Sequence, residues 1–162
     1  MSNKSRALLG SGLGLIWSAA VLIGAALFVQ IPVFALIPTI MTAFLAPGLV
    51  MAAMIARVAQ RRLVDADTGM GPLSEGGETD RRVLQNTLEQ LVLAAAIWPA
   101  AAVLLGPVGP GVIITLGLAF SVARILFWIG CHRSPLLRSV GFAGSFFPTV
   151  LVAVWGLVSL AI

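Results

Sequence analysis

Three polar residues on one predicted helix have the spacing of a ligand-binding face. Arg82, Asn86 and Glu89 stand at positions i, i+4 and i+7, which share one side of an α-helix. The helix that carries them turns apolar directly afterwards, through LVLAAAIWPAAAVLL. The polar face therefore enters a hydrophobic environment, where such side chains need partners or water.

A second charge lies inside the next apolar segment. Arg124 stands eight residues before His132, which places it about 12 Å from the end of its predicted helix. Glu89 lies about 13 Å from the same end of the preceding helix. Either charge alone would be costly in hydrocarbon. We therefore expect Glu89 and Arg124 to pair, directly or through one side chain.

Two interpretations of these charges stay open. In the first, Glu89 and Arg124 form a buried ion pair that only holds two helices in register. In the second, a polar pocket opens to the cytoplasmic face and is lined by Arg82, Asn86, Glu89, Arg124 and Arg138. The excess of arginine in that set favours an anionic ligand. The other arginines near helix ends are expected to be interfacial anchors: Arg57, Arg62, Arg81 and Arg133.

Other kinds of chemistry find little support. The glycine cluster at 10–14 has no strand before it and opens a membrane helix, so helix packing explains it better than nucleotide binding. The chain has one cysteine and one histidine, Cys131 and His132. They are too few for a structural zinc site, and as neighbours on a helix they would diverge, which disfavours a nucleophile–base pair.

Composition indicates what must position these residues. Apolar residues make up 59% of the 162, charged residues only 10%, and the mean hydropathy is +1.05. A soluble domain carries about 25% charged residues. The chain is therefore expected to be an all-α integral membrane protein. Its net charge of +4 comes from basic residues at the ends of apolar segments, so nucleic acid is not an expected partner.

Five membrane-spanning helices are predicted. The first, at 7–29, is too long for a signal-peptide core and is expected to be uncleaved. The second covers 33–59 with two prolines inside it, and 63–79 is a polar cytoplasmic loop. The third begins near Thr79 or Asp80, either of which could cap it. The last two cover 112–132 and 137–160.

The arginines predict the orientation. Lysine and arginine gather at alternate helix ends, while the connections at 30–32 and 105–111 carry no charge. By the positive-inside rule the N-terminus is cytoplasmic and the C-terminus lies on the opposite side.

Two motifs resemble the MAPEG family, the membrane-associated proteins in eicosanoid and glutathione metabolism. The segment 82–89, RVLQNTLE, is similar to the R-x-x-x-N-x-x-E signature of that family. ARILFWIG at 123–130 and RSVGF at 138–142 agree with it in order and spacing. The resemblance covers about residues 33–160 and divides the chain into an extra N-terminal helix (1–31) and a MAPEG-like four-helix domain (32–162).

The resemblance implies a homotrimer that binds glutathione between subunits near the cytoplasmic face. Many members are glutathione transferases or peroxidases that act on hydrophobic substrates. By position, the glutathione contacts would be Arg61, Arg82, Asn86 and Glu89, with Arg124 as a further carboxylate contact. Arg138 matches the arginine thought to stabilise the glutathione thiolate, and is the expected catalytic residue.

The chain departs from the family at several hydrogen-bond donors. Phe127 and Cys131 stand where members often have aromatic hydroxyl or imidazole groups, Gln90 stands where some have tyrosine, and the chain contains no tyrosine. From the resemblance as a whole we expect a membrane-bound glutathione-dependent transferase or peroxidase that acts on a hydrophobic electrophile. The alternative is a non-catalytic MAPEG-like membrane protein with a structural ion pair. A small transporter or channel is a weaker third hypothesis.

Overall fold

The computed structural model describes residues 3–65 and 73–161, and within them the chain is helical without strands. The helices are α1 (Asn3–Phe28), α2 (Leu36–Ala43), α3 (Leu45–Asp65), α4 (Glu75–Leu104), α5 (Gly109–Arg133) and α6 (Pro135–Ala161). Short 3₁₀ turns, Val33–Ala35 and Gly106–Val108, precede α2 and α5. Five segments in the described part are long and apolar enough to cross a membrane, with α2 and α3 together forming one of them. The predicted all-α membrane fold with five spans is confirmed.

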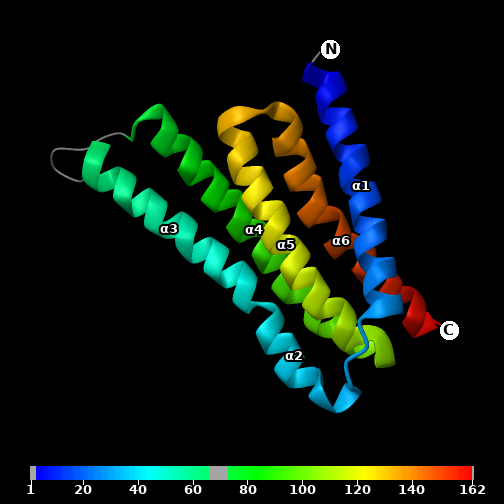
Figure 1. Cartoon of the computed structure of the whole chain (residues 1–162). Helices are drawn as coiled ribbons and strands as arrows, with labels where there is room; N and C mark the ends of the chain where they lie inside the picture. The colour runs from blue at the N-terminus through cyan, green and yellow to red at the C-terminus, as the bar shows by residue number, and fades with distance from the viewer. Residues whose placement is uncertain (1–2, 66–72, 162) are drawn as a thin grey trace.

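The helices form a bundle around α5 (Figure 1). α1 runs along α6 on one side, and α2 and α3 form a bent arm on the other. The start of α1, the end of α3, the start of α4 and the turn from α5 to α6 all lie at one end of the bundle, and the end of α6 lies at the other. We call the end of the bundle where α1 begins the charged end. The helices that meet there carry five arginines: Arg57, Arg61, Arg82, Arg133 and Arg138.

The second predicted span is interrupted where a single kinked helix was expected. α2 ends at Ala43 and α3 begins at Leu45. Pro47 lacks the N–H that would otherwise bond to the carbonyl of Ala43, which weakens the helix at this point and favours the break between α2 and α3. Gly48 resumes the pattern, and its N–H donates to the carbonyl of Phe44 at 2.9 Å.

The predicted start of α4 is wrong by about one turn. The helix begins at Glu75, and its cap is Ser74, whose hydroxyl accepts from the Gly77 N–H at 3.2 Å. Glu75 and Glu78 in the first turn stabilise the positive end of the helix dipole. The polar loop expected at 63–79 is therefore shorter at both ends, since α3 also continues to Asp65. Residues 66–72 of that loop lie outside the described residues.

The apolar core centres on Trp98 of α4, which is fully buried. Its ring stacks on Phe44 with centroids 5.2 Å apart and meets Phe120 edge-on at 5.8 Å. Its indole N–H donates to the Thr149 hydroxyl at 3.3 Å, so the buried polar atom has a partner. This core fixes α4 against α2, α5 and α6 and thereby sets the positions of the polar residues nearer the charged end.

Candidate functional site

A cavity of about 480 Å³ opens between α4 and α6 at the charged end. We call it the α4–α6 cavity. Its lining includes Ser11 of α1, Arg82 and Asn86 of α4, Phe127 and Cys131 of α5, and Arg138 and Phe142 of α6. Three of the predicted site residues, Arg82, Asn86 and Arg138, therefore meet at one cavity. Neither of its arginines forms an ion pair with an acid in the part of the chain that the structure describes.

Close packing of α5 on α6 places Arg138 beside the cavity. A side chain at Gly130 would overlap the backbone of Arg138, and one at Gly141 would overlap the backbone of Phe127. Only glycine allows the two backbones to approach this closely. The first turn of α6 therefore lies directly against the last turns of α5, and Arg138 lines the same cavity as Cys131.

Arg124 lies behind this cavity and is completely buried. Its Nε and Nη2 donate to the Thr87 hydroxyl at 3.1 and 2.8 Å, and Nη1 donates to the Ser145 hydroxyl at 3.3 Å. Nη2 also donates to the Asn86 amide oxygen at 3.0 Å. The guanidinium stands over the ring of Phe127, 4.2 Å from its centroid. We call these side chains the Arg124 network.

The Arg124 network reaches the cavity through Asn86. Because the amide oxygen of Asn86 accepts from Arg124, its N–H groups remain available to a ligand. Arg124 itself does not line the cavity. The predicted role of Arg124 as a direct ligand contact is therefore not supported in the single chain, where it acts as a positioning residue for Asn86.

The predicted pairing of Glu89 with Arg124 is wrong. Glu89 is exposed and accepts from the Gln85 amide at 3.0 Å, one turn back on the same helix. Thr87, the main partner of Arg124, is only two residues away, but residues two apart point to nearly opposite sides of a helix. Arg124 of α5 therefore meets α4 mainly at Thr87, while the Glu89 carboxylate turns to Gln85. Nor does Glu89 line the α4–α6 cavity.

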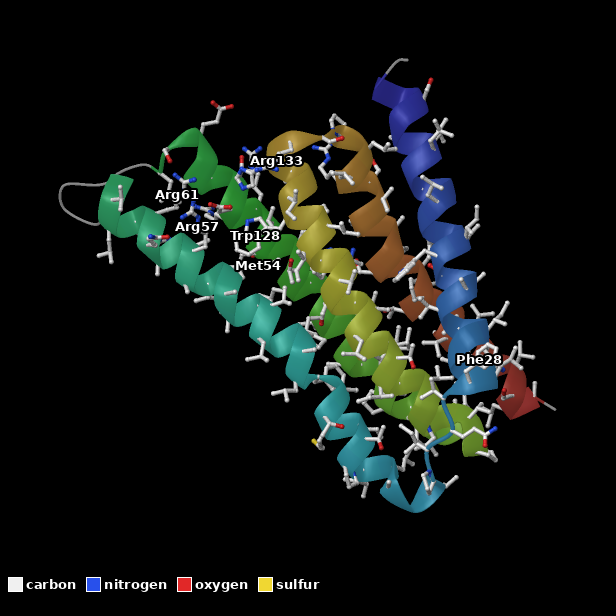
Figure 2. The ribbon with its side chains drawn as sticks, viewed as in Figure 1. Phe28, Met54, Arg57, Arg61, Trp128 and Arg133 are labelled. Carbon is white, nitrogen blue, oxygen red and sulfur yellow. The ribbon has the colours of Figure 1, made fainter. Side chains whose placement is uncertain are left out.

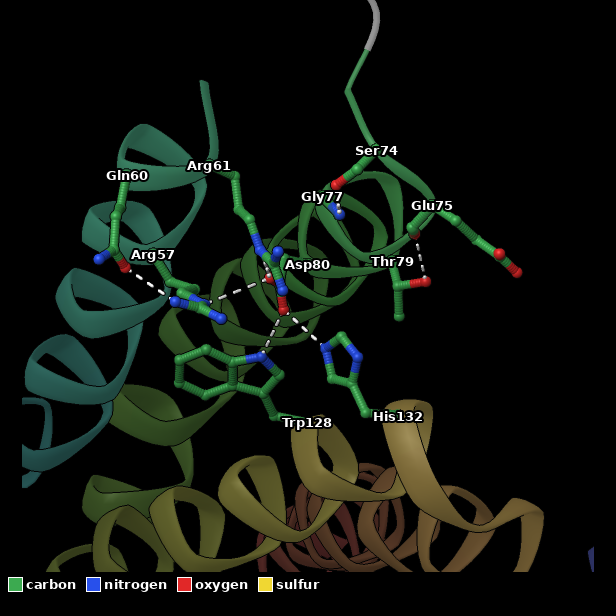
Figure 3. Close-up of polar contacts among 10 residues, drawn as sticks. All are labelled: Arg57, Gln60, Arg61, Ser74, Glu75, Gly77, Thr79, Asp80, Trp128 and His132. Atoms are coloured by element: carbon green, nitrogen blue, oxygen red, sulfur yellow. Dashed lines mark hydrogen bonds and ion pairs between the residues drawn. The ribbon is translucent and has the colours of Figure 1, made fainter. Parts of the chain in front are cut away.

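Arg61 belongs to a different cluster, centred on the buried Asp80 (Figure 3). The Asp80 carboxylate accepts from Arg61 Nε at 3.3 Å and from the Trp128 indole N–H at 2.8 Å. His132 Nε2 lies 2.7 Å from the same carboxylate, and Arg57 Nε lies 3.6 Å from it. These five residues form the Asp80 cluster, which joins α3, α4 and α5. Arg61 does not line the α4–α6 cavity, so the structure separates it from Arg82 and Arg138.

The Asp80 cluster also corrects the expectation for Arg57 and Asp80. Figure 2 shows Arg57 and Arg61 projecting from α3 toward Trp128 of α5, whereas Arg57 was expected to be an interfacial anchor. Asp80 was a candidate cap but lies inside the helix. A signal for its burial exists in the sequence: Asp80, Val83, Thr87, Gln90 and Ala94 follow at steps of three or four and are all buried. An acid on that face requires basic partners from neighbouring helices.

Comparison with known proteins identifies the family. The sequence model of the MAPEG family matches residues 35–158, from the turn before α2 to near the end of α6. Searches of curated proteins and of solved structures return no match. The matched segment contains α2 to α6 and excludes α1. Because it covers most of the chain, the chain belongs to the MAPEG family of all-α membrane proteins.

Proposed function

We propose that the chain is a membrane-bound, glutathione-dependent transferase or peroxidase that acts on a hydrophobic electrophile at the α4–α6 cavity. The observation that carries this proposal is the meeting of Arg82, Asn86 and Arg138 at one cavity inside a membrane bundle. These are three of the positions at which the family signature was found in the sequence. The volume of about 480 Å³ lies within the roughly 300–1,000 Å³ of small-molecule sites.

The chemistry of the lining fits the tripeptide. Glutathione carries two carboxylates, and Arg82 and Arg138 both line the cavity without an acidic partner among the described residues. Guanidinium groups bind carboxylates in a bidentate manner. The N–H groups of Asn86 add neutral donors, and the Arg124 network holds that amide in place. We assign carboxylate binding to Arg82 and polar contact to Asn86.

Arg138 is the proposed catalytic residue. Bound glutathione supplies a nucleophilic thiol, and a cation close to a thiol favours its deprotonated form. In transfer, the sulfur forms a bond to the electrophilic carbon as the leaving group departs, and the thiol proton passes to water at the charged end. In peroxide reduction, two glutathione molecules are oxidised to the disulfide while the peroxide O–O bond breaks to give alcohol and water.

The apolar part of the cavity supports a hydrophobic second substrate. Phe127 and Phe142 both line it, with ring centroids 6.3 Å apart. Phe142 is 39% exposed in the single chain. A lipophilic molecule dissolved in the membrane would reach the cavity past this ring.

The proposed homotrimer accounts for the residues left outside the cavity. Glu89 lies on an exposed face of α4, between Leu88 and Val92, which are 43% and 60% exposed within the described residues. A second copy packed on that face would bring its own polar groups to Glu89. Native mass spectrometry from detergent micelles tests the stoichiometry, and a monomer would contradict it.

The only cysteine of the chain makes glutathione binding directly measurable. Cys131 lines the cavity, so a bound ligand should shield it from alkylation by a maleimide. S-methylglutathione is the suitable competitor because it has no thiol of its own. We expect it to slow modification of Cys131 in the parent protein. Arg82→Leu should weaken that protection, and Arg81→Leu, which changes an exposed arginine paired with Glu78, should not.

The catalytic claim needs a second readout. Arg138→Leu should abolish thiolate absorbance with glutathione and most conjugation, while S-methylglutathione still protects Cys131 in part through Arg82. Arg133→Leu, an exposed arginine outside the cavity, is the control. Equal behaviour of the two variants would contradict the role of Arg138.

The alternative is a non-catalytic MAPEG protein, and one observation favours it. The α5 side of the cavity presents Phe127 and Cys131, neither of which offers a hydroxyl group to a thiolate. Protection of Cys131 by S-methylglutathione without any turnover would support this alternative. If S-methylglutathione does not protect Cys131, glutathione binding is contradicted for the catalytic and the non-catalytic hypothesis alike.

A further inference from the structure

α1 contributes to the α4–α6 cavity although it lies outside the family match. Ser11 lines the cavity together with Arg82 and Arg138. The matched segment begins only at residue 35, after α1 has ended at Phe28. Figure 1 shows α1 running beside α6 along much of its length. The cavity of this chain therefore has a wall that the family model does not include.

Small residues hold α1 tightly against α6 at the level of the cavity. A side chain at Gly10 would overlap Ser139, and one at Gly14 would overlap Ala143 and the backbone of Gly144. Ser18, one turn further on, is completely buried, and its hydroxyl donates to the Gly14 carbonyl at 2.6 Å. Close approach of this kind is the usual way in which membrane helices associate.

The opposite face of α1 makes no such contacts. Among the described residues, a side chain at Gly12 would meet nothing within 4 Å. Leu13 and Ile16 are 50% and 68% exposed, as expected for residues in contact with lipid. α1 therefore has one docking face, and Ser11 lies at the edge of that face beside the cavity.

We infer that α1 is a functional wall of the ligand site, and that Ser11 is a specificity-determining residue for the substrates that the cavity admits. The position of α1 sets the width of the α4–α6 cavity on the α6 side. The small side chain at position 11 leaves room for a ligand beside Arg138. The nature of that ligand rests on the proposed function, but the wall itself rests on the packing of α1 alone.

Moving α1 away from α6 tests the wall. Gly14→Leu places a large side chain where Ala143 already lies, whereas Gly12→Leu adds the same side chain facing open space. The readout is the rate of Cys131 alkylation by a bulky fluorescein maleimide, relative to the rate with the small N-ethylmaleimide. For Gly14→Leu we expect this ratio to rise about tenfold, since access depends on how often the wall is open. Gly12→Leu should match the parent.

Filling the cavity from α1 gives a change in the opposite direction. Ser11→Trp should slow alkylation of Cys131 by both reagents and reduce its protection by S-methylglutathione. Gly12→Trp is the matched control, with the same bulk one residue along. Partial unfolding could imitate the effect of Gly14→Leu, but it could not slow the reaction of a cysteine. If Ser11→Trp reacts at the parental rate, or if Gly14→Leu and Gly12→Leu behave alike, α1 is not a wall of the site.

The two proposals fail in distinguishable ways. The maleimide rates involve no glutathione, so they report on the wall even if glutathione does not bind. Lack of protection by S-methylglutathione in the parent protein, with the expected rates in the α1 variants, would overturn the proposed function and leave the wall standing. Normal protection with unchanged rates in all α1 variants would do the reverse.

Discussion

The guanidinium of Arg124 is surrounded by neutral oxygens. Hydroxyl groups of Thr87 and Ser145 and the amide oxygen of Asn86 accept its hydrogen bonds, and no carboxylate contacts it among the residues that the structure describes. Ser145 links this group of residues to Gln90, because its hydroxyl also donates to the amide oxygen of Gln90 at 2.6 Å. The buried charge is therefore stabilised by several dipoles rather than by one opposite charge.

Removal of the Ser145 hydroxyl should destabilise the protein measurably. Ser145→Ala leaves a donor of Arg124 and the amide oxygen of Gln90 without their partner, and buried unsatisfied groups cost about 1–3 kcal/mol. Ser139→Ala is the control, since its hydroxyl makes one exposed bond to the carbonyl of Pro135. Unfolding by SDS in mixed micelles, followed by circular dichroism, compares the two. A loss no larger than that of the control would contradict the role of Ser145.

Glu89 and Arg124 should behave as independent residues. They share no hydrogen-bond partner, because Glu89 contacts Gln85 and Arg124 contacts Asn86, Thr87 and Ser145. In a double-mutant cycle, the effects of Glu89→Gln and Arg124→Leu on the free energy of unfolding should add to within about 0.5 kcal/mol. A larger coupling energy would indicate that the two side chains meet, within one chain or between copies.

At the scale of the elements, Asp80 joins three helices near the charged end. Its carboxylate contacts Arg57 and Arg61 of α3 and Trp128 and His132 of α5. Asp80 itself is only 2% exposed. α3 is otherwise attached to the bundle mainly by the apolar contacts of Met54 and its neighbours. The Asp80 cluster therefore holds the outer end of the arm formed by α2 and α3.

Neutralising Asp80 should loosen that arm. Asp80→Asn removes the counter-charge of Arg57 and Arg61, and hydrogen bonds to charged groups contribute about 1.5–3 kcal/mol each to stability. We expect Asp80→Asn to lower the free energy of unfolding by about 2–3 kcal/mol. This is less than the sum of the individual hydrogen bonds, because both arginines are partly exposed. Hydrogen exchange should speed up in the last turns of α3 before it does in α5.

Glu78→Gln is the matched control for Asp80→Asn. Glu78 lies 3.8 Å from Arg81 in an exposed i, i+3 pair, and such pairs contribute about 0–1 kcal/mol. If Asp80→Asn lowers the free energy of unfolding by no more than Glu78→Gln does, the Asp80 cluster does not hold α3 against the bundle.

The elements were more predictable from the sequence than the directions of their polar side chains. Long apolar segments with few charges predicted the five spans, and the order of the signature segments brought Arg82, Asn86 and Arg138 to one cavity as the resemblance implies. Depth along a helix follows from counting residues, so Glu89 and Arg124 were placed at the correct level. Their pairing failed because the angle around the helix decides contact, and that angle depends on which face α5 meets.

Partners supplied by other helices were also beyond the sequence. Arg61 was predicted to contact glutathione from its position relative to the family, and the acid that it contacts, Asp80, stands 19 residues later on α4. The role of Ser11 was missed for a different reason. A small residue between two glycines indicates helix packing, and only the position of α1 shows that Ser11 borders a cavity. Contacts between elements distant in the chain are set by the packed bundle.

At the scale of the whole molecule, the charged end should face the cytoplasm. Five spans place the two termini at opposite ends of the bundle, and the positive charge gathers at the end where the N-terminus lies. Reporter domains fused to each terminus should therefore report different compartments, with the N-terminal one inside. If both reporters lie in the same compartment, the prediction of five spans is wrong. If the N-terminal reporter lies outside and the C-terminal one inside, the predicted orientation is wrong.

The contact between α1 and α6 also has a consequence for biogenesis. Gly14 and Ala143 are 129 residues apart in the chain, yet they pack directly against each other. At about 5–20 residues per second, a ribosome takes roughly 6–26 s to make the intervening segment. During that time the glycine face of the first helix has only lipid or the insertion machinery to contact. Because Arg138 and the residues that Gly10 and Gly14 contact all lie on α6, a polypeptide released before α6 has left the ribosome cannot complete the site.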